Sequence, residues 1–308
     1  MPNTYLKYPE IENSYQERNL TYWKEKFPGI LNLVYTIEEK IHGTNIQLEF
    51  DGSKDMTIGT RKVRLGEGHK HMGFRTTLEK YKNFCEVAHL HASMNKRKYT
   101  LYGELFGLKI QKGVNYGTEK HIRFFGLRIN GELQSQEKFY NFMASVGFPE
   151  LIIKRLATVH GLGGALAYQE TFRSNYTPED TVADSGIAEG IVIKPFGTVV
   201  RNTEGDIFYL KKKSEKFKEK ARTPKVHVDS DRRPNPLLEY INENRIESEY
   251  SKSSGKIKYK AEIAGYIKRI KADVIKDYNK EHDVPYENLK GNYSPVGNVI
   301  AKLLLKDL

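Results

Sequence analysis

The chain has 308 residues, 38% of them hydrophobic and 29% charged, with a net charge of +11 at neutral pH. This length suggests about two domains and is ample for sizeable cores. One cysteine, Cys85, excludes intramolecular disulfides and a zinc site built on several cysteines, and predicts a reducing, cytoplasmic setting. No apolar run approaches the roughly 20 residues of a membrane span, so no membrane association is expected.

The positive charge favours a polyanionic partner, and it is unevenly distributed. Residues 211–225 contain eight lysines and arginines against two glutamates. Such a run is most often a solvated surface or a linker, so the charge alone indicates no particular activity.

The first pair of predicted strands encloses one lysine. Residues 33–37 form an apolar run typical of a strand, and residues 46–50 alternate apolar and polar side chains as a second strand should. Lys40 lies between them, beside the turn-forming Gly43. An uncharged lysine amine is a good nucleophile toward phosphorus, but near neutral pH its surroundings must favour loss of the proton. A surface lysine in a hairpin is the alternative.

The octet at 38–45, EEKIHGTN, resembles the nucleotidyl-transfer motif of the covalent nucleotidyltransferases, in the K-x-H-G-T-N form of RNA ligases of the RNA ligase 2 type. The resemblance implies that Lys40 carries the nucleotide covalently. It also implies that Glu39 and Asn45 orient nucleotide or phosphate, and that His42 lies near the leaving pyrophosphate. A structural role is the alternative for His42.

Weaker similarity flanks this motif. Residues 7–13, KYPEIEN, are similar to the opening segment of the same ligases. Arg61 stands in a basic loop where these ligases carry an arginine that contacts phosphate or nucleotide. Residues 77–95 follow helical spacing and predict a helix.

Two strands further along the chain carry candidate nucleotide contacts. Residues 99–107 contain YGELFG, which is similar to the third family motif and implies that Glu104 lies against the ribose. Residues 122–129 form an aromatic strand, on which Phe125 is expected to share a face with Leu127 and to line the adenine. Core packing is the alternative for Phe125.

The remaining motifs follow in the order of the family. The segment 189–194, EGIVIK, resembles the fourth motif, which implies metal binding by Glu189 and nucleotide binding by Lys194. The last strand before the basic run places Lys211 and Lys213 on one face. There the resemblance implies that they hold the α-phosphate of ATP.

These elements predict an α+β fold, with a nucleotidyltransferase (adenylyltransferase) domain of antiparallel sheets flanked by helices and a small all-α C-terminal domain. Residues 137–145 and 156–172 are expected to be helices of the first domain. The predicted boundaries are 1–221 for the first domain, 222–236 for a proline-containing linker and 237–308 for the helical domain.

The resemblance implies an ATP-dependent RNA ligase that joins RNA 3′-hydroxyl and 5′-phosphate ends. Lys40 would first form a lysyl-AMP, the AMP would pass to the RNA 5′ end, and the 3′-hydroxyl would then displace it. Its cofactors would be ATP and Mg²⁺ or Mn²⁺. Its partner would be RNA with a nick or a break, and its expected state is a monomer.

Three alternatives stay open on the sequence. A DNA ligase or a capping-type guanylyltransferase uses the same lysine chemistry, but both tend to carry aspartate at the position of His42. A non-catalytic RNA-binding protein with a nucleotidyltransferase core is favoured by Leu127 and Arg128, which stand where the family has phenylalanine and aspartate. The retained Lys40 and Glu189 favour catalysis.

Overall fold

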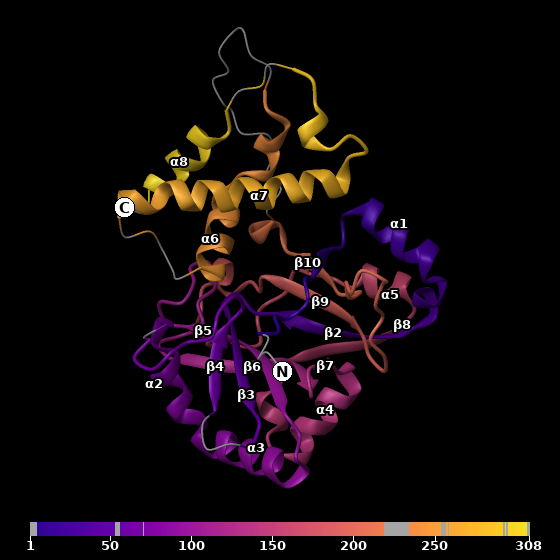
Figure 1. Cartoon of the computed structure of the whole chain (residues 1–308), viewed down its shortest axis with the longest axis vertical. Helices are drawn as coiled ribbons and strands as arrows, with labels where there is room; N and C mark the ends of the chain where they lie inside the picture. The colour runs from indigo at the N-terminus through magenta and orange to yellow at the C-terminus, as the bar shows by residue number, and fades with distance from the viewer. Residues whose placement is uncertain are drawn as a thin grey trace. The chain divides into compact units, whose positions relative to one another are not determined.

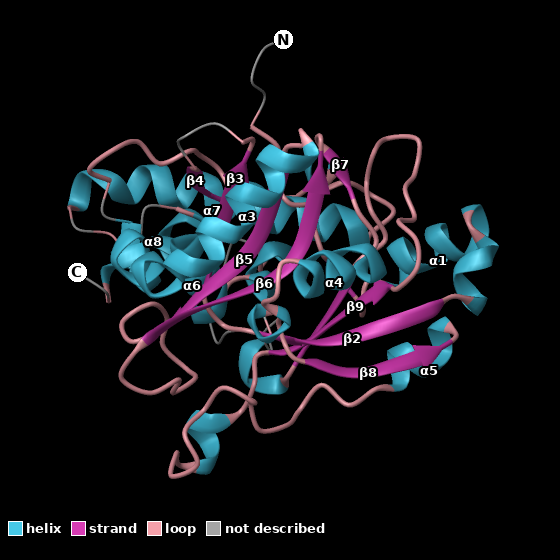
Figure 2. Cartoon of the chain, turned by 90° about the horizontal axis from the view of Figure 1, so that it is seen from below, coloured by secondary structure: helices cyan, strands magenta, loops and turns pink. Residues whose placement is uncertain are grey.

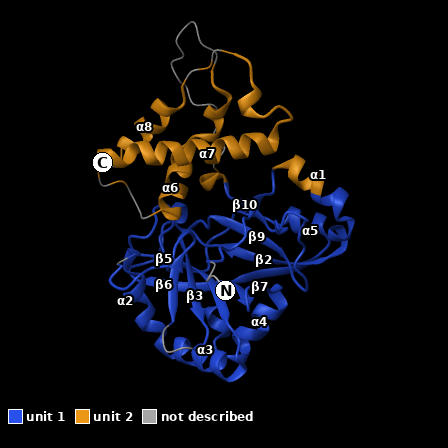
Figure 3. Cartoon of the chain, viewed as in Figure 1, with its two compact units in different colours: residues 1–15, 23–214 blue, residues 16–22, 215–308 orange. Residues whose placement is uncertain are grey.

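The computed structural model describes residues 5–52, 56–69, 71–218, 234–253, 257, 259–291, 293 and 295–306. The chain divides into two compact units (Figure 3). Unit 1 comprises Met1–Tyr15 and Trp23–Ser214, and unit 2 comprises Gln16–Tyr22 and Glu215–Leu308. Most of the predicted linker at 222–236 lies outside the described residues, so the domain boundaries expected from the sequence stay predictions.

Unit 1 contains two five-stranded sheets (Figure 1, Figure 2). The first has the order β1, β10, β9, β2, β8. Its strands are β1 (Glu12–Asn13), β2 (Val34–Lys40), β8 (Arg155–His160), β9 (Gly190–Pro195) and β10 (Leu210–Lys213). β9 pairs antiparallel with both β2 and β10, and its first residue, Gly190, lies opposite Lys40 on one side and Lys213 on the other. Three segments far apart in the sequence therefore meet at one end of this sheet.

The second sheet is antiparallel and has the order β4, β3, β5, β6, β7. Its strands are β3 (Thr44–Phe50), β4 (Thr57–Thr60), β5 (Tyr99–Gly107), β6 (Lys120–Ile129) and β7 (Glu132–Leu133). A turn at residues 41–43 joins β2 of the first sheet to β3 of the second. The two sheets are thus connected directly after Lys40.

The helices of unit 1 bury apolar faces against these sheets. They are α2 (Phe74–Leu78), α3 (Lys82–Asn95), α4 (Gln136–Ser145) and α5 (Leu162–Ala167), and α1 (Glu17–Lys26) spans the boundary between the units. Phe84 of α3 and Phe139 of α4 belong to the core of the second sheet and are almost fully buried. Burial of such a side chain contributes about 1.5–3 kcal/mol. α5 packs against β2 and β8 of the first sheet.

The backbone of the N-terminal segment accepts hydrogen bonds from side chains of the second sheet. The hydroxyl of Tyr102 donates to the carbonyl oxygen of Leu6 at 2.7 Å, and Arg128 donates to the carbonyl oxygen of Lys7 at 3.4 Å. Arg128 also donates to the hydroxyl of Tyr102 at 3.0 Å. Arg128, which departs from the family pattern, therefore has a structural role in this chain.

The described part of unit 2 is helical. Its helices are α6 (Glu243–Lys252), α7 (Ile263–Glu281) and α8 (Gly297–Leu305). They enclose a separate core that includes Leu237, Tyr240, Ile246, Ile270, Val274 and Ile300. Among the helices within the described ranges, none combines the length and the hydropathy that crossing a bilayer would require.

The structure confirms the predicted fold class and most of the predicted elements, but one helix is wrong. Residues 156–160 of the expected helix 156–172 lie in the edge strand β8, and within that segment only residues 162–167 are helical. β8 pairs with β2, with Val159 opposite Tyr35. This pairing joins residues more than 100 positions apart, so the local spacing of apolar residues could not predict the strand.

Candidate active site

Lys40 ends β2 where the chain turns toward the second sheet, and the turn is pressed against β5. A Cβ atom at Gly43 would lie 2.4 Å from the carbonyl oxygen of Leu105, so only glycine fits this position. The side chain of Lys40 is 22% exposed. The close packing of the turn against β5 therefore fixes the backbone position of Lys40.

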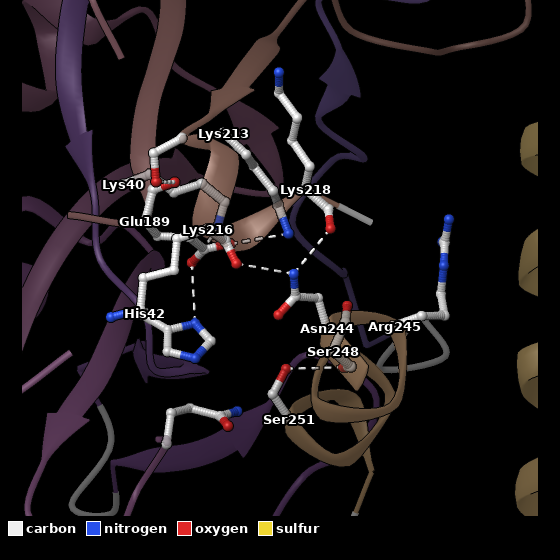
Figure 4. A network of polar contacts seen from close by, with 12 residues as sticks. Lys40, His42, Glu189, Lys213, Lys216, Lys218, Asn244, Arg245, Ser248 and Ser251 are labelled. Atoms are coloured by element: carbon white, nitrogen blue, oxygen red, sulfur yellow. Dashed lines mark hydrogen bonds and ion pairs between the residues drawn. The ribbon is translucent and has the colours of Figure 1, made fainter. Parts of the chain in front are cut away.

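Glu189 is the centre of the candidate site (Figure 4). Its Oε2 atom lies 2.8 Å from Nζ of Lys40 and 3.3 Å from Nδ1 of His42, and its Oε1 atom lies 3.0 Å from Nζ of Lys213. The next residue, Gly190, has a φ of +150°, and a Cβ there would lie 2.1 Å from a carbonyl oxygen of β10. Glycine thus allows β9 to begin in close contact with β10, beside the lysines of both neighbouring strands.

The surrounding charges keep Glu189 ionised. Its side chain is only 5% exposed, and burial opposes ionisation. Lys40, Lys213 and His42 outweigh this effect and hold the pKa of Glu189 well below its ordinary value. The ion pair holds the Lys40 ammonium against the carboxylate, so Lys40 can act as a nucleophile only after its nitrogen loses a proton and leaves this pair.

Glu104 and Arg61 belong to the same electrostatic cluster. Glu104 lies within β5 rather than at its end, opposite Asn45 on β3. Burial raises the pKa of Glu104 to about 8, against the opposing charges of Lys40 and Arg61. Oδ1 of Asn45 is buried and accepts no hydrogen bond from the residues that the structure describes.

Lys211 and Lys213, two of the three lysines of β10, lie on one face of the strand, as the alternation predicted. Lys211 pairs with Val192 and Lys213 with Gly190 in the antiparallel register. Lys212 lies on the opposite face and forms an ion pair with Glu170 at 2.9 Å. Of the two expected phosphate-binding lysines, Lys213 contacts Glu189.

The structure does not bring Glu39 into this cluster. Glu39 is fully buried, and its Oε1 accepts a hydrogen bond from the hydroxyl of Ser174. Its Oε2 accepts from the backbone N–H and the side-chain amide of Asn175 at 3.0 and 2.8 Å. Burial raises the pKa of Glu39, although these donors oppose the rise. Glu39 therefore links residues 174 and 175 to β2 through hydrogen bonds. Its buried position does not support the expected contact with nucleotide.

Phe125 does not share a face with Leu127, because a β-bulge interrupts the strand. Two consecutive residues of β5 pair with Gly126 and Phe124, which leaves Phe125 as the extra residue. Its ring packs edge-on against Tyr8 with the centroids 4.8 Å apart, and 9% of the residue is exposed. Core packing is therefore the role that the structure supports, rather than the expected contact with adenine.

Lys194 is also placed away from the cluster. It is 1% exposed, and its Nζ lies 2.7 Å from Glu38 and donates to the carbonyl oxygen of Phe125 at 2.8 Å. The rings of Tyr8 and Tyr209 surround the ammonium, with centroids at 5.7 and 5.6 Å. Lys194 thus forms a buried internal pair, which does not support the expected nucleotide contact. Its partner Glu38 begins the octet 38–45, but the sequence predicts no particular role for it.

A divalent ion fits the donor set around Glu189. Within the described ranges, no group of three or more His, Cys, Asp or Glu side chains forms a complete metal cage. Mg²⁺, however, is commonly held by one or two carboxylates together with substrate phosphates and water. A single buried carboxylate beside cations suited to phosphate matches this mode of binding.

Glu104→Gln is expected to stabilise the protein at alkaline pH and to leave its stability near pH 5 almost unchanged. The pKa of Glu104 in the folded protein, about 8, lies above its ordinary value of 4.5. Between these values the folded protein binds more protons than the unfolded chain, so its stability falls as the pH rises. Glutamine avoids this loss. Melting temperatures of both proteins at pH 5, 7 and 9 check this, and a difference that is independent of pH would contradict it.

The fold and the cluster together define a class of protein. Lys40 and Lys213 contact the two oxygens of the buried Glu189 where the first sheet passes into the second, which is the grouping that the resemblance to the covalent nucleotidyltransferases predicts. Residues 33–213 match the RNA ligase family. The chain belongs to the RNA ligase family, which confirms the family predicted from the sequence. A comparison with curated proteins finds no match.

Solved structures of an RNA ligase from Naegleria gruberi share the fold. The apo form of one point mutant has a TM-score of 0.51 at 14% identity, and the match covers 70% of this chain and 57% of that one. A second point mutant, with ATP and Mn, gives the same values. A third, with AMP and Mn, has a TM-score of 0.50 at 14% identity, with 70% and 57% covered. The chain therefore matches little more than half the length of these structures.

Proposed function

We propose that the protein is an ATP-dependent RNA ligase that joins RNA 3′-hydroxyl and 5′-phosphate ends through a covalent lysyl-AMP. The observation that carries this proposal is the meeting of Lys40, His42 and Lys213 on the two oxygens of Glu189. Two of the Naegleria gruberi structures contain ATP or AMP together with Mn, which supports ATP as the nucleotide and Mn²⁺ or Mg²⁺ as the ion. The monomeric state and the cytoplasmic setting stay predictions.

In the first step, the uncharged Nζ of Lys40 attacks the α-phosphorus of ATP. A nitrogen–phosphorus bond forms, the bond from the α-phosphorus to the bridging oxygen breaks, and pyrophosphate leaves. The attacking and leaving atoms must be in line, so the main task of the protein is to position them and to neutralise charge. The short turn after Lys40, held against β5, provides this positioning.

The AMP then passes to the RNA. An oxygen of the RNA 5′-phosphate attacks the phosphorus of the lysyl-AMP and releases Lys40. The 3′-hydroxyl of the second RNA end attacks the 5′-phosphorus, which forms the phosphodiester and releases AMP. All three steps are phosphoryl transfers that one set of positive charges can serve.

The remaining side chains have roles that follow from their positions. Lys213, together with Lys211 on the same face, neutralises the oxygens of the α-phosphate. Glu189 would hold a divalent ion, which when bound would neutralise further phosphate charge. Asn45 and Glu104, which lie opposite each other on β3 and β5, would contact the nucleotide.

The non-catalytic alternative is favoured by the departure at Leu127 and Arg128. A structural role accounts for Arg128, which donates hydrogen bonds to the hydroxyl of Tyr102 and to the carbonyl oxygen of Lys7. A DNA ligase and a guanylyltransferase share the lysine chemistry, so the substrate must separate them from an RNA ligase.

Sealing assays test the proposal. With ATP and Mg²⁺, a nick flanked by RNA ends should be joined, whereas GTP in place of ATP should give no product. The same nick in an all-DNA duplex should be sealed more slowly. Faster sealing of the all-DNA nick would indicate a DNA ligase, and use of GTP alone would indicate a guanylyltransferase.

A further inference from the structure

We propose that Tyr116 is a positioning residue for Lys40. Its hydroxyl holds the backbone of the turn 41–43, and thereby sets the position of the Lys40 side chain relative to Glu189 for AMP attachment. The inference rests on the proposed function. It extends that function to a residue that no sequence motif singled out.

The hydroxyl of Tyr116 contacts the backbone of the turn directly. Its oxygen accepts a hydrogen bond from the N–H of His42 at 2.9 Å, and the residue is 6% exposed. A second contact comes from the same loop, because the side-chain amide of Gln111 donates to the carbonyl oxygen of Gly43 at 3.4 Å. Two consecutive residues of the turn are thus held by one loop.

The turn has two supports. Gly43 packs against β5, where a Cβ would lie 2.4 Å from a carbonyl oxygen. Tyr116 holds the backbone of the preceding residue, His42. The imidazole of His42 reaches the Oε2 atom of Glu189, which also contacts Lys40. Tyr116 holds the backbone of His42, and through it the positions of two side chains. These are Lys40 and His42, which both contact Oε2 of Glu189.

The loop that carries Tyr116 is itself anchored. Its two ends are joined by a hydrogen bond from the N–H of Leu108 to the carbonyl oxygen of Glu119 at 3.1 Å. In its middle, the N–H of Asn115 donates to the carbonyl oxygen of Ser185 at 2.7 Å. The ring of Tyr116 packs edge-on against Phe106 with the centroids 5.0 Å apart. Tyr116 is thus a fixed support.

Tyr116 acts as a neutral phenol. Burial raises its pKa well above the ordinary value, and the carboxylates of Glu39, Glu189 and Glu104 add to the rise. A phenol that stays neutral neither takes the Lys40 proton nor offers a negative charge to the metal. Its contribution is the hydrogen bond that its oxygen accepts.

Tyr116→Phe tests the inference, because it removes the hydroxyl and keeps the ring. At saturating ATP, the rate constant for AMP attachment should fall about 10- to 100-fold, since small misplacements of reacting groups cost factors of this size. The ATP concentration at half saturation should stay within about two-fold of the wild type, because the hydroxyl contacts the turn and not the nucleotide.

Tyr35→Phe is the matched control. The hydroxyl of Tyr35 is also buried and donates to the carbonyl oxygen of Ile30 at 2.6 Å, away from the cluster. Both variants lose one buried hydroxyl hydrogen bond, so their melting temperatures should fall by similar amounts. Only Tyr116→Phe should be slow in AMP attachment.

The outcomes separate the inference from the function on which it rests. Equal attachment rates in Tyr116→Phe and Tyr35→Phe would overturn the positioning role. A raised half-saturating ATP concentration with an unchanged rate constant would overturn it too. If the wild type attaches no AMP, the proposed function is wrong, and the inference that rests on it is wrong as well.

Gln111→Leu is a second variant for the case that Tyr116→Phe does not fold. It should lower the rate constant for AMP attachment about 3-fold at an unchanged melting temperature. An unchanged rate constant would overturn the inference.

Discussion

Lys40→Ala is expected to abolish AMP attachment and to reduce the joining of RNA ends with ATP at least about a thousand-fold. The reason is that every step depends on AMP that first passes through this amine. Lys213 is the competing amine of the cluster, and it contacts the other oxygen of Glu189 from a different strand. Intact mass and a sealing assay with labelled RNA measure the two losses.

An RNA whose 5′-phosphate is already joined to AMP shows whether Lys40→Ala has lost only the nucleophile or has also lost its fold. Lys40 has completed its covalent role once AMP is on the RNA. The Lys40→Ala variant should therefore still join this substrate when no ATP is present. AMP attachment to Lys40→Ala at the rate of the wild type would show that another residue is the nucleophile.

Glu189→Gln is expected to slow AMP attachment about 100- to 1,000-fold. Glutamine removes the negative charge that Lys40, Lys213 and His42 share, and it leaves two ammonium groups facing each other without compensation. It also removes the carboxylate that is placed to hold a divalent ion. The rate constant should fall, and the Mg²⁺ concentration at half saturation should rise, when both are measured in single-turnover reactions.

Glu49→Gln is the matched control for this change. Glu49 is 7% exposed and also contacts two cations, Arg64 at 3.1 Å and Lys98 at 2.8 Å, outside the cluster. It should therefore lower stability by an amount similar to Glu189→Gln while AMP attachment continues at nearly the normal rate. Equal losses of attachment in the two variants would mean that destabilisation alone explains the effect.

Features that depend on near neighbours could be predicted from the sequence. The apolar run, the lysine, the glycine and the alternating run at 33–50 became β2, the turn and β3. Lys211 and Lys213 share a strand face because alternation is a property of the local backbone. The order of the motifs was sufficient to predict that Lys40, Glu189 and Lys213 act together, and the sheet places them at one end of three strands.

Features that depend on distant partners could not be predicted. The bulge at Phe125 is set by its register with β5, so simple alternation placed this side chain on the wrong face. Lys194 follows the family motif, yet its contacts with Glu38 of the neighbouring strand and with the carbonyl oxygen of Phe125 in the second sheet join residues far apart in the sequence. The contact of Tyr116 with His42 joins residues 74 positions apart, and nothing in the local pattern of either residue indicates it.

The most direct test of the lysyl-AMP proposal is an intact-mass spectrum of the protein after incubation with Mg²⁺ and either ATP or GTP. The protein must first be cleared of any AMP that it already carries. A gain of one AMP with ATP alone, mapped to the peptide that contains Lys40, is the expected result. No gain with either nucleotide, or a gain mapped to another residue, would contradict the account.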